Sequence, residues 1–414
     1  MNKDIVYRYN LIYLFIIIVW PVIKINFLDI DGAGRIESAF TLLAIIVNFQ
    51  SFFHLPKAMY FWLIWIAYCV VSIHYKGFGI VDYPFLLWLP HNLLMPMVAM
   101  VVVYKCALYN YQDIIKTMFI YLLIYALVGT IIMFFNRDAI KADYLSNTVS
   151  NDQLNSMIIL FPIAALCKKA KIINTLVLFS VTFMILFGII LSGERKAIAG
   201  LFLMIIGYFL SKNPNFNFRS FLLLGFIALI SYFTVSFFLA NSLAGERLDE
   251  SLSSSEFQDN LFLKILGDRA LMYVEGFDFF LENPITGLGL TNFINHSIIA
   301  LHILHTEYMV QLAECGIIGT FLFLLFFGSM IVKIVKLFFL KIEREQTMIY
   351  AATLASILMI AFTAWIYDCL MYFVFYGFLL SFYDRVRPMS IQRKRINKRQ
   401  LARIYEANNV ISSR

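Results

Sequence analysis

Charged residues are scarce in this sequence. Only 14% of its 414 residues are Asp, Glu, Lys or Arg, and 61% are hydrophobic. Soluble domains carry about 25% charged residues. Apolar runs recur along most of the chain, and many approach the roughly 20 residues that a helix needs to cross a bilayer. This pattern excludes a soluble globular protein. It predicts an all-α polytopic membrane protein that forms a single integral membrane domain over residues 1–414.

Cysteine is scarce as well, and the five cysteines are far apart in the chain. No Cys-x-x-Cys pair and no Cys/His spacing typical of a metal site is present. A disulfide framework is therefore excluded, and we expect these side chains to be small apolar core residues. The five are Cys69, Cys106, Cys167, Cys315 and Cys369.

No small-residue cleavage site follows the first apolar run, because Pro21 and Lys24 stand where one is expected. We therefore interpret this run as the first span and not as a signal peptide. The net charge of +7 lies mostly in loops and in a basic tail at 385–414. Such a tail is typical of a cytoplasmic anchor on anionic lipid, so we expect no nucleic acid as a partner.

About twelve spans are predicted from the apolar runs. Most of the 33 Lys and Arg residues fall in alternate loops, and the positive-inside rule then places both termini in the cytoplasm. One long polar loop at 241–304 separates the ninth and tenth spans and faces outward. The spans are predicted at 11–28, 39–53, 58–73, 85–104, 117–135, 154–167, 172–191, 196–211, 221–240, 312–332, 347–366 and 369–383.

The sequence LSGERKAIAG places an arginine beside an unusually short span. The apolar run from Ala197 to Leu210 has about 14 residues, or roughly 21 Å of helix, which is short for a hydrocarbon core of about 30 Å. The preceding residues must complete the span, which draws Arg195 below the outer surface. A guanidinium in the first turn of a helix makes an anion site. The alternative is an arginine that reaches the interface or pairs with Glu194.

The outer loop contains a predicted amphipathic helix at 257–281. Apolar residues recur there at helical spacing, and Asp268, Glu275 and Glu282 lie on another face. We expect this helix on the membrane surface or over the bundle. Arg269, near its start, is either an anion ligand or a solvated or headgroup-bound arginine. The following sequence NPITGLGLTNF predicts a turn.

The third constellation is LHILHTEYMVQLAECGIIG, which leads into the tenth span. Glu307, Gln311 and Glu314 form a polar stripe with i, i+4, i+7 spacing. His305 precedes the stripe at the expected helix start, and it is either a functional base or an interfacial histidine. His302 and His305 have a spacing that suits a metal ion, but no third ligand supports one.

Together, L-S-G-E-R-K, G-D-R…N-P-I-T-G-L-G-L-T-N-F and H-T-E-Y…L-A-E-C-G-I-I-G resemble the motifs of the O-antigen ligase and polymerase superfamily. They span residues 191–319, and the rest of the chain is similar only as a string of spans. The resemblance implies a twelve-span fold in the bacterial inner membrane with its active site facing the periplasm. It also implies an undecaprenyl-pyrophosphate-linked oligosaccharide as substrate, with a flippase and a chain-length regulator as partners.

The resemblance also implies roles for three residues. The arginine after the S-G pair corresponds to Arg195, the loop arginine to Arg269, and the histidine that opens the last motif to His305. Family members often have Asn after this histidine, whereas Thr306 stands there in this chain. The departure concerns the neighbour of the histidine and not the histidine.

These residue types suit the displacement of a pyrophosphate from an anomeric carbon. Guanidinium groups bind phosphate oxygens and stabilise the developing charge. Histidine titrates near neutral pH and suits removal of the proton from the acceptor hydroxyl. We expect Arg247, Lys196 and Glu307 to assist in binding the pyrophosphate or the glycan.

Two aspartates in the first outer loop, Asp29 and Asp31, present an alternative. Some membrane glycosyltransferases keep a catalytic Asp and a metal ion in that loop. We interpret this pair as a solvated acidic loop, and we expect neither a metal ion nor another cofactor.

The sequence therefore predicts an inverting, metal-independent glycosyltransferase that polymerises lipid-linked repeats for O-antigen, capsule or exopolysaccharide. Two alternatives stay open. A ligase would transfer the glycan to the lipid A core of lipopolysaccharide. A non-enzymatic flippase or transporter would place ionisable residues deep in its spans, whereas charge in this chain clusters at the outer edge.

Overall fold

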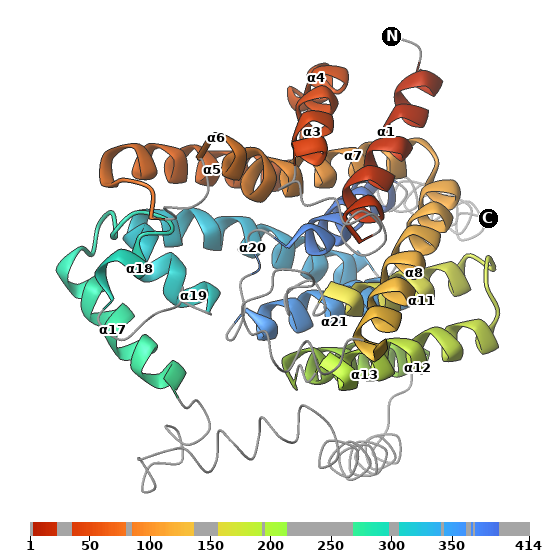
Figure 1. The fold of residues 1–414 in the computed structure, drawn as a ribbon. Helices are drawn as coiled ribbons and strands as arrows, with labels where there is room; N and C mark the ends of the chain where they lie inside the picture. Colours follow the sequence, from red (N-terminus) through yellow and green to blue (C-terminus); the bar gives the residue numbers. More distant parts are fainter. Residues whose placement is uncertain are drawn as a thin grey trace, which may run out of the picture.

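The described residues of this chain are all-helical wherever they form regular structure. The computed structural model describes residues 3–22, 35–79, 85–135, 156–192, 195–212, 268–297, 306–340, 343–361, 366 and 369–388. Every regular element in these ranges is a helix (Figure 1). The all-α prediction is thus confirmed for this part of the chain.

The helices follow one another with short connections. The first third contains α1 (Lys3–Ile18), α3 (Arg35–Val47), α4 (Phe49–Phe52), α5 (Lys57–Lys76), α6 (Phe85–Trp88), the π-helical turn η1 (Leu89–Leu94), α7 (Met95–Tyr109) and α8 (Tyr111–Phe135). The remainder contains the 3₁₀ turn η2 (Ser156–Ile159), α11 (Leu160–Lys169), α12 (Thr175–Ser192), α13 (Arg195–Lys212), α17 (Asp268–Glu282), α18 (Phe293–His296), α19 (Glu307–Met309), the π-helical turn η3 (Val310–Glu314), α20 (Cys315–Leu340), α21 (Arg344–Ile360) and a last helix at 370–388.

A helix lies over at least part of every predicted span except 221–240, which lies outside the described residues. Five segments are long and apolar enough to cross a membrane, and two shorter apolar helices lie at Thr175–Leu191 and Ala197–Lys212. The chain is therefore a multi-pass membrane protein, whereas the number twelve stays a prediction. The five segments are Lys3–Val22, Lys57–Lys76, Leu89–Tyr109, Tyr111–Ile131 and Glu307–Phe339.

Aromatic side chains join α5 to α20 and to the last helix. Trp62 and Trp65 stack on one another with ring centroids 4.5 Å apart. The Trp62 ring also lies 4.8 Å from Phe326 of α20 and 4.9 Å from Phe373 of the last helix. All four side chains are buried. Because large aromatic rings dominate packing energies, this cluster fixes α5 against the C-terminal helices.

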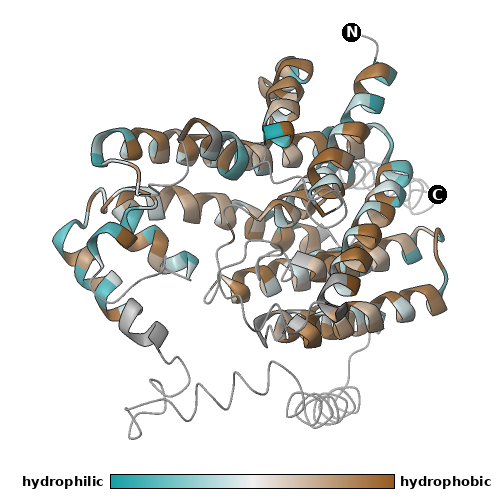
Figure 2. Cartoon of the chain, viewed as in Figure 1, coloured by the Kyte–Doolittle hydropathy of each residue, from teal (hydrophilic) through white to brown (hydrophobic). Residues whose placement is uncertain are grey.

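Large apolar side chains also cover the outside of the long helices. Phe179 and Phe183 of α12 are 70% and 64% exposed, and Phe339 near the end of α20 is 81% exposed. Hydrophobic residues run along most of each long helix, and hydrophilic ones gather towards the ends (Figure 2). Such exposed apolar surface is typical of helices that face lipid.

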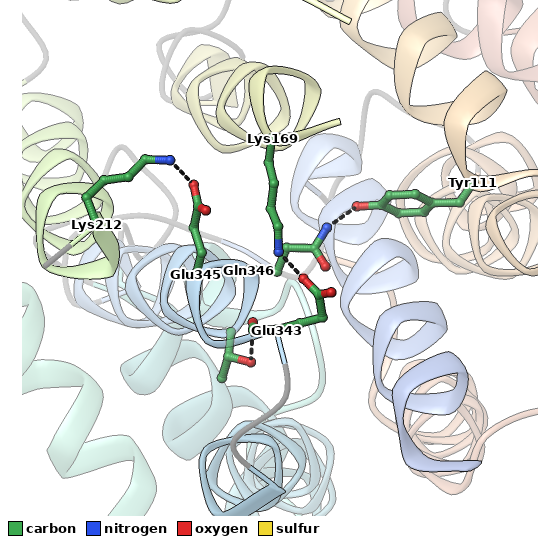
Figure 3. A network of polar contacts seen from close by, with 7 residues as sticks. Tyr111, Lys169, Lys212, Glu343, Glu345 and Gln346 are labelled. Carbon is green, nitrogen blue, oxygen red and sulfur yellow. Dashed lines mark hydrogen bonds and ion pairs between the residues drawn. The ribbon is translucent and has the colours of Figure 1, made fainter. Parts of the chain in front are cut away.

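The loops that were predicted to be cytoplasmic meet at one end of the bundle, which we call the lysine-rich end. Lys169 after α11 pairs with Glu343 before α21, and Lys212 at the end of α13 pairs with Glu345 (Figure 3). The last helix continues to residue 388, so the first residues of the tail predicted at 385–414 are helical. Three separate predicted inner loops therefore lie on the same side of the protein.

Candidate active site

The packing of α13 on α21 determines where the first candidate arginine lies. Ser356 of α21 donates a hydrogen bond to the Gly200 carbonyl of α13 at 2.9 Å. A Cβ added at Gly207 would lie 2.2 Å from the Cβ of Ala352. Residue numbers rise along α13 as they fall along α21, so the two helices are antiparallel. The first residue of α13 therefore lies at the end of the bundle where α21 ends, opposite the lysine-rich end.

The start of α19 is joined to the same end of α21. The backbone N–H of Glu307 donates to the Ala361 carbonyl at 2.9 Å, directly after α21. The Tyr308 hydroxyl donates to the Leu358 carbonyl at 3.0 Å. The starts of α13 and α19 are separated by more than a hundred residues in the chain, yet both lie at the end of α21.

The Glu307 side chain is buried and has protein donors on both carboxylate oxygens. Ile366 donates its backbone N–H to Oε2 at 2.7 Å, and the Gln311 amide donates to Oε1 at 2.8 Å. The Trp65 indole N–H in turn donates to Gln311 Oε1 at 2.9 Å. A buried carboxylate with donors on both oxygens is held in one orientation. This network ties the segment that follows the candidate histidine to α5 and to the chain after α21.

Glu314, at the end of the π-helical turn η3, holds the turn at 283–293. The backbone N–H of Thr291 donates to its Oε2 at 2.8 Å, and that of Phe293 donates to its Oε1 at 3.0 Å. Gly289 donates its N–H to the Glu314 backbone carbonyl at 2.8 Å. The Glu314 side chain is buried, so the turn supplies the donors that the carboxylate needs away from water.

Two glycines allow this turn to approach the start of α20. Gly287 and Gly316 have φ values of +67° and +62°, which favour glycine. A Cβ on Gly287 would lie 2.4 Å from the Glu314 carbonyl oxygen, and one on Gly316 would lie 2.6 Å from the Ile285 carbonyl oxygen. The glycines of the sequences NPITGLG and ECGIIG thus allow the two backbones to lie against each other.

The same turn is bonded to the end of α5. The Asn292 amide donates to the Gly77 carbonyl at 3.0 Å, and the Tyr68 hydroxyl donates to the Cys315 carbonyl at 2.7 Å. Side chains of the first third of the chain therefore hold the backbone of the last third. The turn is a packed part of this end of the bundle and not an exposed loop.

The elements just described lie within the part of the chain that is similar to known proteins. Residues 180–324 match the O-antigen ligase family. The match confirms the resemblance to the O-antigen ligase and polymerase superfamily. It covers about a third of the chain and contains α13, α17, the buried turn and the start of α20. A comparison with curated proteins gives no match.

Three candidate residues of this O-antigen ligase segment lie at helix starts. Arg195 and Lys196 are the first two residues of α13, and Arg269 is the second residue of α17. The predicted first-turn position of Arg195 is confirmed. The structure describes the backbone of these residues, and α17 packs against α19 and η3.

Other candidate residues lie outside the described residues. They include His305 and Arg247 of the ligase segment, and also Asp29 and Asp31 of the first predicted outer loop. The description of the ligase segment resumes at Thr306, which is buried. Within the described parts of the chain, no three His, Cys, Asp or Glu side chains gather closely enough to hold a metal ion.

Sequence reasoning identified part of this network and missed the rest. It grouped Glu307 with Gln311, and the two are hydrogen-bonded. It gave no role to Trp65 or Tyr68, because nothing in the apolar run of α5 distinguishes them from other aromatic core residues. The missed residues support the ligase segment from outside its boundaries.

Proposed function

We propose that this protein is a membrane glycosyltransferase that polymerises lipid-linked oligosaccharide repeats. It transfers a glycan from undecaprenyl pyrophosphate to the acceptor sugar of another lipid-linked repeat. The observation that carries the proposal is that the family match at 180–324 contains two helix starts, those of α13 and α19, that lie at one end of α21. The same family resemblance implies that basic residues at these two starts act on one substrate.

The chemistry proceeds by a single displacement. His305 takes the proton of the acceptor hydroxyl as its oxygen bonds to the anomeric carbon. The bond from that carbon to the pyrophosphate oxygen breaks, and the configuration inverts. Arg195 and Arg269 bind the leaving pyrophosphate, assisted by Lys196 and Arg247. A helix N-terminus adds a partial positive charge beside Arg195.

Glu307 takes a different role in this proposal from the one that its sequence position first indicated. Its carboxylate is buried and accepts hydrogen bonds from Gln311 and Ile366, which favours positioning over direct contact with the glycan. By holding the start of α19, the Glu307 network fixes the chain two residues after His305. A fixed base reduces the entropy cost of reaching the transition state.

The proposed setting is the bacterial inner membrane, with twelve spans and both termini in the cytoplasm. The gathering of predicted inner loops at the lysine-rich end supports this orientation, because positive charge favours the cytoplasmic side. The opposite end, with the starts of α13 and α19, then faces the periplasm. A flippase would deliver the substrate there, and a chain-length regulator would act beside it.

The test is a reaction with purified components. The protein is placed in vesicles with a single lipid-linked repeat as the only glycan. A ladder of longer lipid-linked products, released pyrophosphate lipid and activity in excess chelator are the expected results. No new glycosidic bond with competent substrate would overturn the proposal. A strict need for Mg²⁺ or Mn²⁺ would overturn its metal-independent chemistry and direct attention to Asp29 and Asp31.

A ligase reaction is the second candidate, because the matching family carries the description O-antigen ligase. The two reactions differ in the acceptor that they need. Vesicles that contain the lipid-linked repeat and lipid A core would give one transfer to the core if the protein is a ligase. Ladder formation without lipid A core would exclude a protein that is only a ligase.

A further inference from the structure

The described part of α17 has three distinct sides. One side faces the protein: Gly276 is buried, and the Phe279 ring meets the Phe293 ring edge-on at 5.6 Å. A second side carries Val274, Phe277 and Leu281, which are 59%, 49% and 59% exposed. Apolar side chains of this size are seldom grouped in water without a reason.

The third side of α17 is acidic. With about 100° of rotation per residue, the exposed apolar side chains cover an arc of about 60°. Asp278 and Glu282 are exposed and follow this arc on the side away from Phe277. The outward surface of the helix is therefore divided lengthwise into an apolar stripe and an acidic edge. A helix that faced only water would not need this division.

The apolar stripe continues onto the surface of a predicted span. Ile317 donates its N–H to the Pro284 carbonyl at 2.8 Å, and Ile318 donates to the Ile285 carbonyl at 3.3 Å. Ile285 is 63% exposed and Ile317 is 54% exposed. Phe321, one turn further along α20, is 59% exposed and lies within the segment Glu307–Phe339 that is long enough to cross the membrane.

The direction of α17 agrees with a place at the membrane surface. The helix lies crosswise to α20 and α5 at the end of the bundle (Figure 1). Hydrophobic and hydrophilic residues both occur along it, whereas α20 is mostly hydrophobic (Figure 2). A helix that crosses the ends of the spans, with one apolar and one charged side, matches the pattern of interfacial helices.

We infer that α17 binds the outer leaflet of the membrane through the stripe Val274, Phe277, Leu281 and Ile285. The stripe enters the boundary between headgroups and acyl chains, and the acidic edge at Asp278 and Glu282 faces water. Because the edge beside the stripe is acidic, burial of apolar surface drives the contact, and anionic lipid is not required. This inference concerns where α17 lies, and it is independent of the glycosyl transfer proposed above.

The experiment measures the depth of single positions in the full-length protein. Val274→Cys, Leu281→Cys and Glu282→Cys are each labelled with an environment-sensitive thiol fluorophore in phosphatidylcholine vesicles. The unsubstituted protein, labelled in the same way, gives the background from its own cysteines, and Phe321→Cys serves as the lipid-exposed reference. One quencher is a nitroxide on the lipid acyl chain, and the other is iodide in water.

The acyl-chain nitroxide should quench the labels at 274 and 281 several-fold more than the label at 282, and close to the level at 321. Iodide should show the reverse order. Equal iodide quenching at 274, 281 and 282 would overturn the inference. So would poor quenching of 274 and 281 by both agents, which indicates coverage by another protein surface. Quenching at 274 and 281 that appears only after phosphatidylglycerol is added would also overturn it. A variant that inserts as expected and yet makes no polymer would count only against the proposed function.

Discussion

The two ends of the helix bundle hold their carboxylates in opposite ways. At the lysine-rich end, Glu343 and Glu345 pair with lysines, and these glutamate side chains are 44% and 25% exposed. At the other end, Glu314 and Glu307 are 1% and 0% exposed, and their printed donors are backbone N–H groups and one amide. The first arrangement is a solvated ion pair, and the second is a buried hydrogen-bonded anion.

The difference indicates which end has a fixed shape. Exposed ion pairs contribute about 0–1 kcal/mol, because water screens them and long side chains lose freedom. A hydrogen bond to a buried charge contributes about 1.5–3 kcal/mol, and a lost partner leaves the other group unsatisfied. The lysine-rich end can therefore tolerate substitution, while the opposite end depends on a few precise contacts. Preorganised contacts of this kind are what a catalytic site requires.

The largest effect on stability is expected at Glu314. Glu314→Ala removes two hydrogen bonds to a charge and leaves the N–H groups of Thr291 and Phe293 buried without their acceptor. We expect the free energy of unfolding to fall by about 3–5 kcal/mol, measured by chemical denaturation in detergent. Glu345→Ala at the lysine-rich end is the matched control. If both variants unfold alike, the contrast between the two ends is wrong.

The second expectation concerns turnover. Arg195→Ala, Arg269→Ala and His305→Ala should each lower polymerisation by roughly 100-fold or more, which is about 3 kcal/mol of transition-state stabilisation. Their stability should change little, unlike that of Glu314→Ala. Lys169→Ala and Lys212→Ala remove positive charge at the other end and should keep near-normal turnover. Full activity in all three site variants at equal expression would remove these residues from the mechanism.

The elements at the candidate site were partly predictable from local sequence. The apolar spacing of 257–281 predicted an amphipathic helix, and α17 occupies Asp268–Glu282. The short apolar run after LSGERK predicted Arg195 in a first turn, and α13 begins there. Helical periodicity and span length are properties of neighbouring residues, so one sequence contains them.

The contacts that hold the site were not predictable in this way. The bond between Trp65 and Gln311 joins residues 246 apart in the chain. The directions of Glu307 and Glu314 depend on the π-helical turn η3, which changes the helical register between them. On regular spacing both carboxylates formed one stripe, whereas the structure gives them to different partners. Tertiary geometry of this kind leaves no mark in a local pattern.

A third, smaller effect separates backbone approach from general helix packing. Gly316→Ala forces a Cβ to within 2.6 Å of the Ile285 carbonyl oxygen at a φ of +62°. We expect a loss of about 2 kcal/mol in the free energy of unfolding. Gly328→Ala on the same helix is the control, because nothing lies within 4 Å of the added carbon. It should be neutral or raise stability by about 0.5–1 kcal/mol. Equal losses in both variants would mean that helix α20 tolerates no alanine, and not that the approach of the turn is special.

The smallest effect is expected at the lysine-rich end, where the comparison is most easily broken. Lys169→Ala leaves Glu343 partly exposed to water, so the unfolding free energy should fall by less than about 1 kcal/mol. The difference from the unsubstituted protein should shrink further in high salt, because screening already weakens the original pair. Denaturation at low and high ionic strength measures this. A salt-insensitive loss of several kcal/mol would show that Lys169 and Glu343 act as a buried pair. In that case the two ends would be held by the same kind of interaction, and the fixed shape could no longer be assigned to one end alone.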